Sequence, residues 1–285
     1  MLSQKAQSLK SSPTLALVAK AKELSAKGHD VISLTVGEPD WETYPAAAAA
    51  GIEAIQSGFT KYTAAQGTIE LRKAIGERIK ADLNLDYNPQ KEIAVTSGAK
   101  FAIFSALQVL CDPKDEVIIH SPYWVSYPTM AELAGATPRI VHCDETVNFK
   151  LTPENLEKNL NSQSKVFLFC SPSNPTGFVY SAAELRALAD VLLKFPRVCI
   201  ITDDMYNRLM FNKTLVAPHI LQVAPELRDR TVVINGGSKA YSMTGWRIGW
   251  AMGPEKIIKA IGDFASQATG ASSSISQRAA EVALK

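Results

Sequence analysis

Apolar runs and helical patterns alternate along the chain from Glu92 onward. The runs at 92–96, 116–120, 137–141, 165–170, 198–202 and 231–235 have the length and composition of buried strands. Between them, residues 101–110, 126–134, 153–160 and 182–194 carry apolar side chains at helical spacing. This alternation predicts an α/β fold in which a mainly parallel sheet is covered by helices on both faces.

The apolar run at 247–252 departs from this alternation, because no helical pattern precedes it. Only about a dozen residues separate it from the strand that ends at Asn235, too few for a comfortable right-handed helical crossover. We therefore expect this run to be antiparallel to its neighbours.

The N-terminal part predicts four further elements. Ser12 as N-cap and Pro13 in the first turn begin a helix that Gly28 closes. A strand is expected at 31–35, and helices are expected at 45–57 and 69–83. A last helix runs from Ser276 to the end of the chain.

The composition of the chain argues against several classes of function. The chain has 285 residues and a net charge of +2 with mixed signs, so it offers no basic face for nucleic acid. It has no apolar run of 18 residues, which predicts no membrane span, and its first ten residues do not resemble a signal peptide. The four cysteines form no Cys-x-x-Cys pair and the four histidines show no metal spacing. We expect a cytoplasmic protein with buried thiols.

The stretch 235–250 carries the candidate chemistry. Glycines, serines and a threonine follow an apolar strand and surround Lys239 and Arg247. A lysine desolvated at a strand end becomes a nucleophile toward aldehydes, and an arginine fork suits a phosphate. An aldehyde and a phosphate together describe pyridoxal phosphate. The alternative is a surface hairpin with solvated cations.

The residues from Ser238 to Arg247 read Ser-Lys-Ala-Tyr-Ser-Met-Thr-Gly-Trp-Arg. This segment resembles the signature of class I aminotransferases, which are fold-type I pyridoxal phosphate enzymes. The resemblance implies that Lys239 bonds to the cofactor aldehyde and, once displaced by substrate, moves a proton. It also implies a three-layer large domain at 46–285 and an N-terminal segment, 1–45, that belongs to a small domain.

The start of the helix after the 92–96 strand is a candidate phosphate site. Gly98 and Ala99 place free amides at a helix N-terminus, where anions bind. Alone, this segment is as well explained as a tight strand–helix turn. The resemblance implies that Gly98, Ala99, Ser238 and Arg247 hold the cofactor phosphate.

Other strand ends receive roles from the same resemblance. Asp203 pairs with the pyridine nitrogen, which keeps the ring protonated and able to accept electrons. Asn174 and Tyr206 reach the ring oxygen, and Trp124 stacks on the ring. Asn174 and Trp124 are also expected to contact the substrate. Asp204 departs from the family, where glutamate is more usual.

Two residues ahead of the sheet also match family positions. Gly37, in Gly-Glu-Pro-Asp, contacts the substrate through its backbone, although the tetrapeptide is equally a plain turn. Tyr62 reaches the cofactor phosphate of a neighbouring subunit. The resemblance therefore implies a homodimer with shared active sites.

The substrate prediction depends on three residues. In the bacterial-type aspartate aminotransferase subgroup, a lysine at the position of Lys100 reaches the distal carboxylate of the substrate, and a Ser-x-Thr pair, here Ser12 and Thr14, closes over it. This implies L-aspartate and 2-oxoglutarate as substrates, with prephenate as a further acceptor. The alternative for Lys100 is a solvated cation or a second phosphate contact.

Members of the family continue for on the order of 100 residues beyond the position of Lys285, a size typical of a domain segment. We therefore expect most of the small domain, and the arginine that clamps the substrate α-carboxylate, to lie outside this sequence. Two alternatives to an aspartate aminotransferase remain open. One is another fold-type I enzyme, such as an aromatic, alanine or prephenate aminotransferase or a C–S lyase. The other is a cofactor-binding module without catalysis.

Overall fold

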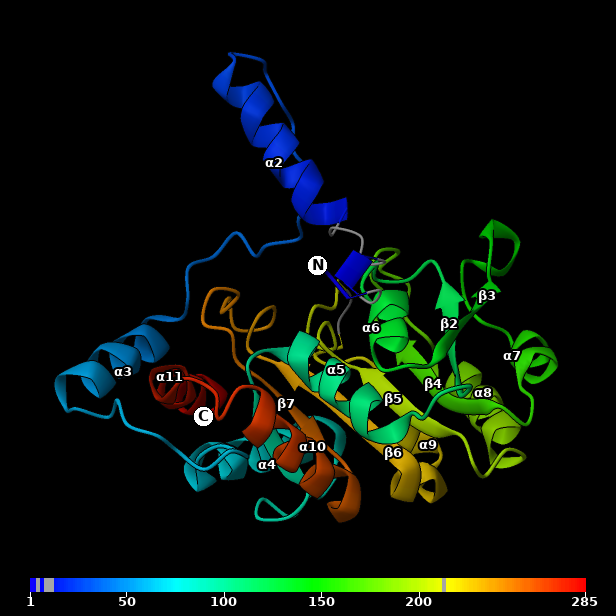
Figure 1. Cartoon of the computed structure of the whole chain (residues 1–285). Helices are drawn as coiled ribbons and strands as arrows, with labels where there is room; N and C mark the ends of the chain where they lie inside the picture. The colour runs from blue at the N-terminus through cyan, green and yellow to red at the C-terminus, as the bar shows by residue number, and fades with distance from the viewer. Residues whose placement is uncertain (4–5, 8–12, 212–213) are drawn as a thin grey trace.

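The computed structural model describes residues 1–3, 6–7, 13–211 and 214–285, and within these ranges it forms one seven-stranded sheet (Figure 1). The strands are β1 (Ile93–Thr96), β2 (Glu116–Ser121), β3 (Thr137–His142), β4 (Ser164–Cys170), β5 (Cys199–Asp203), β6 (Thr231–Gly236) and β7 (Gly249–Met252), in the order β1-β7-β6-β5-β4-β2-β3. β7 pairs antiparallel with both β1 and β6, and the other pairs are parallel. The prediction of one antiparallel strand after Arg247 is confirmed.

The sheet is the middle of three layers, with a hydrophobic core on each of its faces. Successive side chains of a strand point to opposite faces and therefore enter different cores. In β4, Val166 and Leu168 pack in one core and Phe167 and Phe169 in the other. The first core is completed by α5 (Ala99–Leu110), α6 (Tyr127–Leu133) and α10 (Glu255–Ala268). The second is completed by α4 (Ile69–Leu83), α7 (Pro153–Asn159), α8 (Ala182–Leu193), α9 (Ile220–Val223) and α11 (Ser274–Leu284). The predicted three-layer α/β fold is confirmed.

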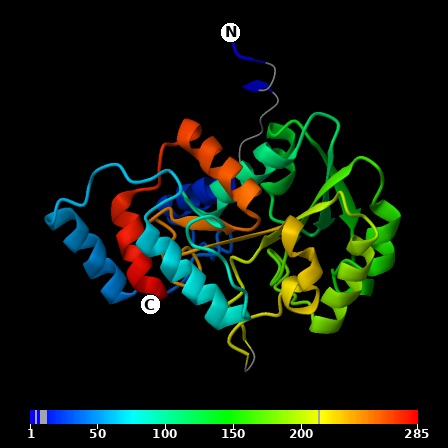
Figure 2. The same ribbon diagram turned by 90° about the horizontal axis from the view of Figure 1, so that it is seen from below.

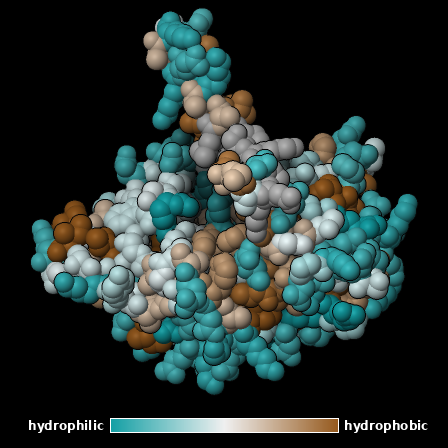
Figure 3. Space-filling view, viewed as in Figure 1, coloured by the Kyte–Doolittle hydropathy of each residue, from teal (hydrophilic) through white to brown (hydrophobic). Residues whose placement is uncertain are grey.

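The N-terminal helices lie outside these layers. The helix α2 (Pro13–Ala26) projects away from the body, and α3 (Pro45–Gln56) packs beside α11 at one end of the molecule (Figures 1 and 2). Apolar side chains gather on the surface at α3, where Ile52 and Ile55 are exposed (Figure 3). Among the described residues, no helix is long and apolar enough to cross a membrane.

The prediction of a strand at 31–35 is wrong. This segment has no strand pairing, and Ile32 and Leu34 are 87% and 92% exposed. Its apolar alternation matches a strand locally, but a strand forms only where another offers free backbone groups. The edges of the sheet are β1 and β3, and neither pairs with this segment.

Candidate active site

A cleft of about 700 Å³ opens where β4, β5 and β6 end, and the segment 34–38 forms part of its wall. This is the edge at which ligands collect in open parallel sheets. Ten of the residues selected from the sequence line it: Gly37, Ala99, Lys100, Trp124, Asn174, Asp203, Tyr206, Ser238, Lys239 and Arg247. Gly98 lies directly behind Arg247.

Lys239 sits in the turn that follows β6, with its side chain in the cleft. Its Nζ donates a hydrogen bond to the carbonyl oxygen of Gly37. Burial lowers the pKa of Lys239, Glu38 opposes that shift and the charge of Arg247 adds to it. The amine is therefore more readily neutral, and more nucleophilic, than that of an exposed lysine.

Asp203, the last residue of β5, is 5% exposed and points into the cleft. Its Oδ2 accepts a hydrogen bond of 2.5 Å from the Tyr127 hydroxyl, and its Oδ1 accepts one of 3.2 Å from the amide of Met205. Burial raises its pKa to about 6, and the nearby charge of Asp204 contributes, while the two hydrogen bonds act in the opposite direction. At neutral pH Asp203 is therefore mainly an anion in a cleft that Lys100, Lys239 and Arg247 also line.

Asn174 and Tyr206 meet across the cleft. Asn174 Nδ2 donates a 2.9 Å hydrogen bond to the Tyr206 hydroxyl. The pair comes from the loop after β4 and the segment after β5, so two neighbouring strand ends supply it. Together they present an amide and a phenol to any oxygen bound beside Asp203.

The part of the cleft beside the start of α5 is suited to bind an anion. Gly98 caps α5 with φ of +90°, which L side chains rarely adopt, and it leaves the first amides of α5 free. The Arg247 guanidinium lies against Gly98: a Cβ on this glycine would be 2.9 Å from Nη2. Arg247 also donates to the Thr244 carbonyl oxygen at 2.7 Å. Helix amides, a guanidinium and the buried Ser238 therefore face one space.

Lys100 and Trp124 form the outer wall of the cleft. Lys100 Nζ lies 4.7 Å from the centroid of the Trp124 ring, which is a cation–π contact. The Trp124 ring packs edge-on against Tyr127, with centroids 5.4 Å apart and planes at 89°. Burial, and to a smaller extent Arg247, lowers the pKa of Lys100.

One predicted residue, Tyr62, does not line the cleft, and the predictions for two others fall outside the described residues. Tyr62 is 99% exposed and borders a separate hollow with residues 269 and 271–275. Ser12 falls outside the described residues. Thr14 lies in α2, but its side chain is also outside the described part of the chain.

Sequence reasoning gave no role to Tyr127, although its hydroxyl binds Asp203. The tyrosine begins α6, 76 positions before the aspartate, and no spacing within one sequence links them. It also missed the contact between Thr244 and Glu38, two residues that line the cleft.

The residues fit pyridoxal phosphate. The lining of the cleft supplies an anionic carboxylate, a partly buried amine and an anion cradle, the three kinds of group that suit the ring nitrogen, aldehyde and phosphate of the cofactor. Within the described residues, no group of three or more His, Cys, Asp or Glu side chains could hold a metal ion.

Comparison with known proteins agrees with this geometry. The family model described as aminotransferase class I and II matches residues 29–285. The aspartate/prephenate aminotransferase of Nitrosomonas europaea is 47% identical over 283 residues, or 99% of this chain and 71% of that protein. The aspartate aminotransferase of Geobacillus stearothermophilus is 47% identical over 98% of this chain and 70% of its own. The crystal structure of the Rhizobium meliloti aspartate aminotransferase superposes with a TM-score of 0.95 at 42% identity, covering 100% of this chain and 71% of that one.

Proposed function

Because the chain belongs to the class I and II aminotransferases, and is therefore a pyridoxal-phosphate-dependent enzyme, we propose that it transfers the amino group of L-aspartate to 2-oxoglutarate, with prephenate as a further acceptor. The observation that carries the proposal is Lys100, a cation held at the mouth of the cleft against Trp124. The names of the relatives, aspartate and aspartate/prephenate aminotransferases, support aspartate and prephenate among these substrates.

We assign the cofactor to the residues that line the cleft. The amides of Gly98 and Ala99, with Ser238 and Arg247, would hold the phosphate. Trp124 would pack on the ring. The Asp203 carboxylate would accept a hydrogen bond from the ring nitrogen and keep it protonated, since a nearby anion favours the charged form.

When bound, pyridoxal phosphate supplies an aldehyde and a protonated ring that withdraws electrons from the α carbon of an amino acid. The chain's own part is to orient and to move protons. Asn174 and Tyr206 donate hydrogen bonds to the ring oxygen. The amine of Lys239 would take the proton from the α carbon of the amino acid and deliver it to the carbon that bore the cofactor's aldehyde.

The preference for an acidic substrate follows from charge. Lys100 is exposed, but partial desolvation beside Trp124 lowers its pKa, so its ammonium is incompletely hydrated and gains from pairing with an anion that the substrate brings. A distal carboxylate satisfies that charge, whereas an aromatic side chain does not. The carbonyl of Gly37, close to Lys239, lies where the substrate backbone is expected.

The test uses a version of the protein extended to the full length of its relatives, and follows the bound cofactor by absorbance after a single addition of amino acid. L-Aspartate is expected to convert the cofactor to pyridoxamine phosphate, and Lys100→Ala should lower kcat/KM for aspartate tenfold or more. The same variant should change the value for phenylalanine by less than about threefold. Lys259→Ala, an exposed lysine on α10, is the matched control.

Three results would contradict the proposal. Equal losses for aspartate and phenylalanine would remove Lys100 as the specificity residue. Release of a thiol, pyruvate and ammonia from an S-alkylcysteine, without formation of pyridoxamine phosphate, would favour the lyase alternative. A cofactor that binds but never reacts would favour the non-catalytic alternative.

The proposal includes a homodimer in the cytoplasm. Its support is Tyr62, which is 99% exposed and lines a hollow separate from the cleft, and the exposed side chains of Ile52 and Ile55 on α3. The four cysteines are free, as in a reducing compartment. Mixing the variants Tyr62→Phe and Lys239→Ala should restore activity by forming one intact shared site. A monomer in sedimentation, with no restoration on mixing, would refute the shared site.

A further inference from the structure

The loop that carries Asn174 has an outgoing limb, residues 171–173, and a returning limb, residues 177–180, joined by hydrogen bonds. The amide of Ser173 donates to the Phe178 carbonyl oxygen at 3.0 Å, and the amide of Gly177 donates to the Ser173 carbonyl oxygen at 2.8 Å. At its base, the amide of Tyr180 donates to Ser171 Oγ at 3.2 Å. Ser171 Oγ is thus the side-chain atom that ties the returning limb to the outgoing limb, three residues before Asn174.

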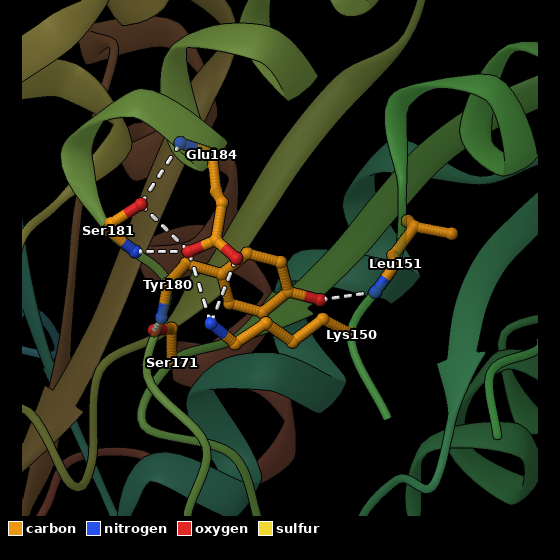
Figure 4. Close-up of polar contacts among 6 residues, drawn as sticks. All are labelled: Lys150, Leu151, Ser171, Tyr180, Ser181 and Glu184. Atoms are coloured by element: carbon orange, nitrogen blue, oxygen red, sulfur yellow. Dashed lines mark hydrogen bonds and ion pairs between the residues drawn. The ribbon is translucent and has the colours of Figure 1, made fainter. Parts of the chain in front are cut away.

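The returning limb is anchored through Tyr180. This side chain is 1% exposed, and its hydroxyl oxygen accepts a 2.6 Å hydrogen bond from the amide of Leu151 (Figure 4). Its ring packs edge-on against Phe169 of β4, with centroids 4.9 Å apart. Tyr180 therefore fixes the base of the loop against both the central sheet and the segment ahead of α7.

An ion pair between Lys150 and Glu184 lies beside the Tyr180 ring. Lys150 Nζ contacts both carboxylate oxygens of Glu184, at 2.9 and 3.1 Å, and lies 5.5 Å from the centroid of the Tyr180 ring (Figure 4). Glu184 also accepts hydrogen bonds from Ser181, with which it forms the capping box that starts α8. The loop thus ends at a helix start whose position is set by side chains from two segments.

We propose that Ser171 and Tyr180 are positioning residues that hold the Asn174 amide at the cofactor site. Neither touches the cleft, and both act through the loop. Loss of the Ser171 contact lets the two limbs separate at their base, and loss of the Tyr180 hydroxyl releases the returning limb from Leu151. In both cases the 2.9 Å hydrogen bond from Asn174 to Tyr206 is no longer held in place. This inference rests on the proposed role of Asn174 as a donor to the cofactor ring oxygen.

The experiment is a double-mutant cycle with the affinity of the apoprotein for pyridoxal phosphate as its readout, measured by quenching of tryptophan fluorescence. Ser171→Ala should weaken binding about threefold to tenfold, the equivalent of one hydrogen bond. In an Asn174→Ala background the same change should weaken binding less than twofold, because the group that it positions is already gone.

Ser164→Ala is the matched control. Ser164 lies at the opposite end of β4, is 4% exposed and likewise accepts a backbone hydrogen bond, from Asn161 at 2.9 Å. It should lower the unfolding temperature as Ser171→Ala does and leave cofactor affinity unchanged. Tyr180→Phe, which removes only the hydroxyl, is the second variant and should repeat the Ser171→Ala pattern.

Three other results of this experiment would overturn the inference, and they can be told apart. If Ser171→Ala and Tyr180→Phe weaken binding equally with and without Asn174, their role is structural only and the inference is overturned. If they have no effect while Asn174→Ala weakens binding, the inference again fails but the assignment of Asn174 stands. If Asn174→Ala itself leaves affinity unchanged, the proposed role of Asn174 fails and the inference fails with it.

Discussion

Gly249 decides how closely β7 approaches the first turn of α5, which is the proposed phosphate cradle. A Cβ placed on Gly249 would lie 2.6 Å from the carbonyl carbon of Gly98 and 3.0 Å from the Cα of Ala99. Carbon atoms in contact are normally about 3.5–4.0 Å apart. Both sides of the contact are backbone, so no side chain can rotate away. In Gly249→Ala the start of α5 must therefore move by about 1 Å.

Two effects follow, and their sizes differ. Overpacking of this kind costs about 1–3 kcal/mol of folding free energy. The displaced amides of α5 also lose their alignment with a bound phosphate, and hydrogen bonds to a charged group contribute about 1.5–3 kcal/mol. We expect Gly249→Ala to bind pyridoxal phosphate at least about tenfold more weakly and to have a lower unfolding temperature.

The assay combines thermal unfolding of the apoprotein with a fluorescence titration of the cofactor. Gly76→Ala is the control, because its added Cβ makes only ordinary contacts, the nearest at 3.5 Å, inside α4. It should stabilise the protein by about 0.5–1 kcal/mol through helix propensity and leave affinity unchanged. Native affinity and native stability in Gly249→Ala would refute the close approach of β7 to α5.

Three further predictions concern other residues. Borohydride reduction and peptide mapping should place the pyridoxyl label on Lys239, and a label on Lys100 would overturn that assignment. Burial raises the pKa of Asp204 to about 7, so the folded protein keeps a proton that the unfolded chain loses near pH 4, and stability falls as the pH rises between these values. Asp204→Asn should therefore raise the free energy of unfolding in urea by at most about 4 kcal/mol at pH 8, and should not raise it at pH 3; an equal gain at both pH values would contradict this. Asp82→Asn should cost about 1–3 kcal/mol in chemical unfolding at pH 7, since the buried Asp82 pairs with Arg208, and an unchanged midpoint would exclude that role.

Much of the fold was readable from the sequence because it depends on local pattern. The 69–83 helix agrees with α4, and each apolar run from Glu92 onward corresponds to a strand of the sheet. The antiparallel β7 followed from the length of one connection. The location of the site followed too, because parallel strands expose the residues after them at one edge, where Asn174 and Asp203 lie.

What the sequence by itself determined, then, is which segments are strands and helices and which side chains stand at the strand ends. Hydrophobic period and turn chemistry act over a few residues and leave their record in order along the chain. Only the tertiary structure decided that segment 31–35 finds no strand partner, that Tyr127 binds Asp203 and that Ser171 and Tyr180 brace the Asn174 loop. Such contacts depend on which elements the folded layers bring together. The bond between Tyr127 and Asp203 spans 76 positions, and no pattern at one end of that interval specifies the partner at the other.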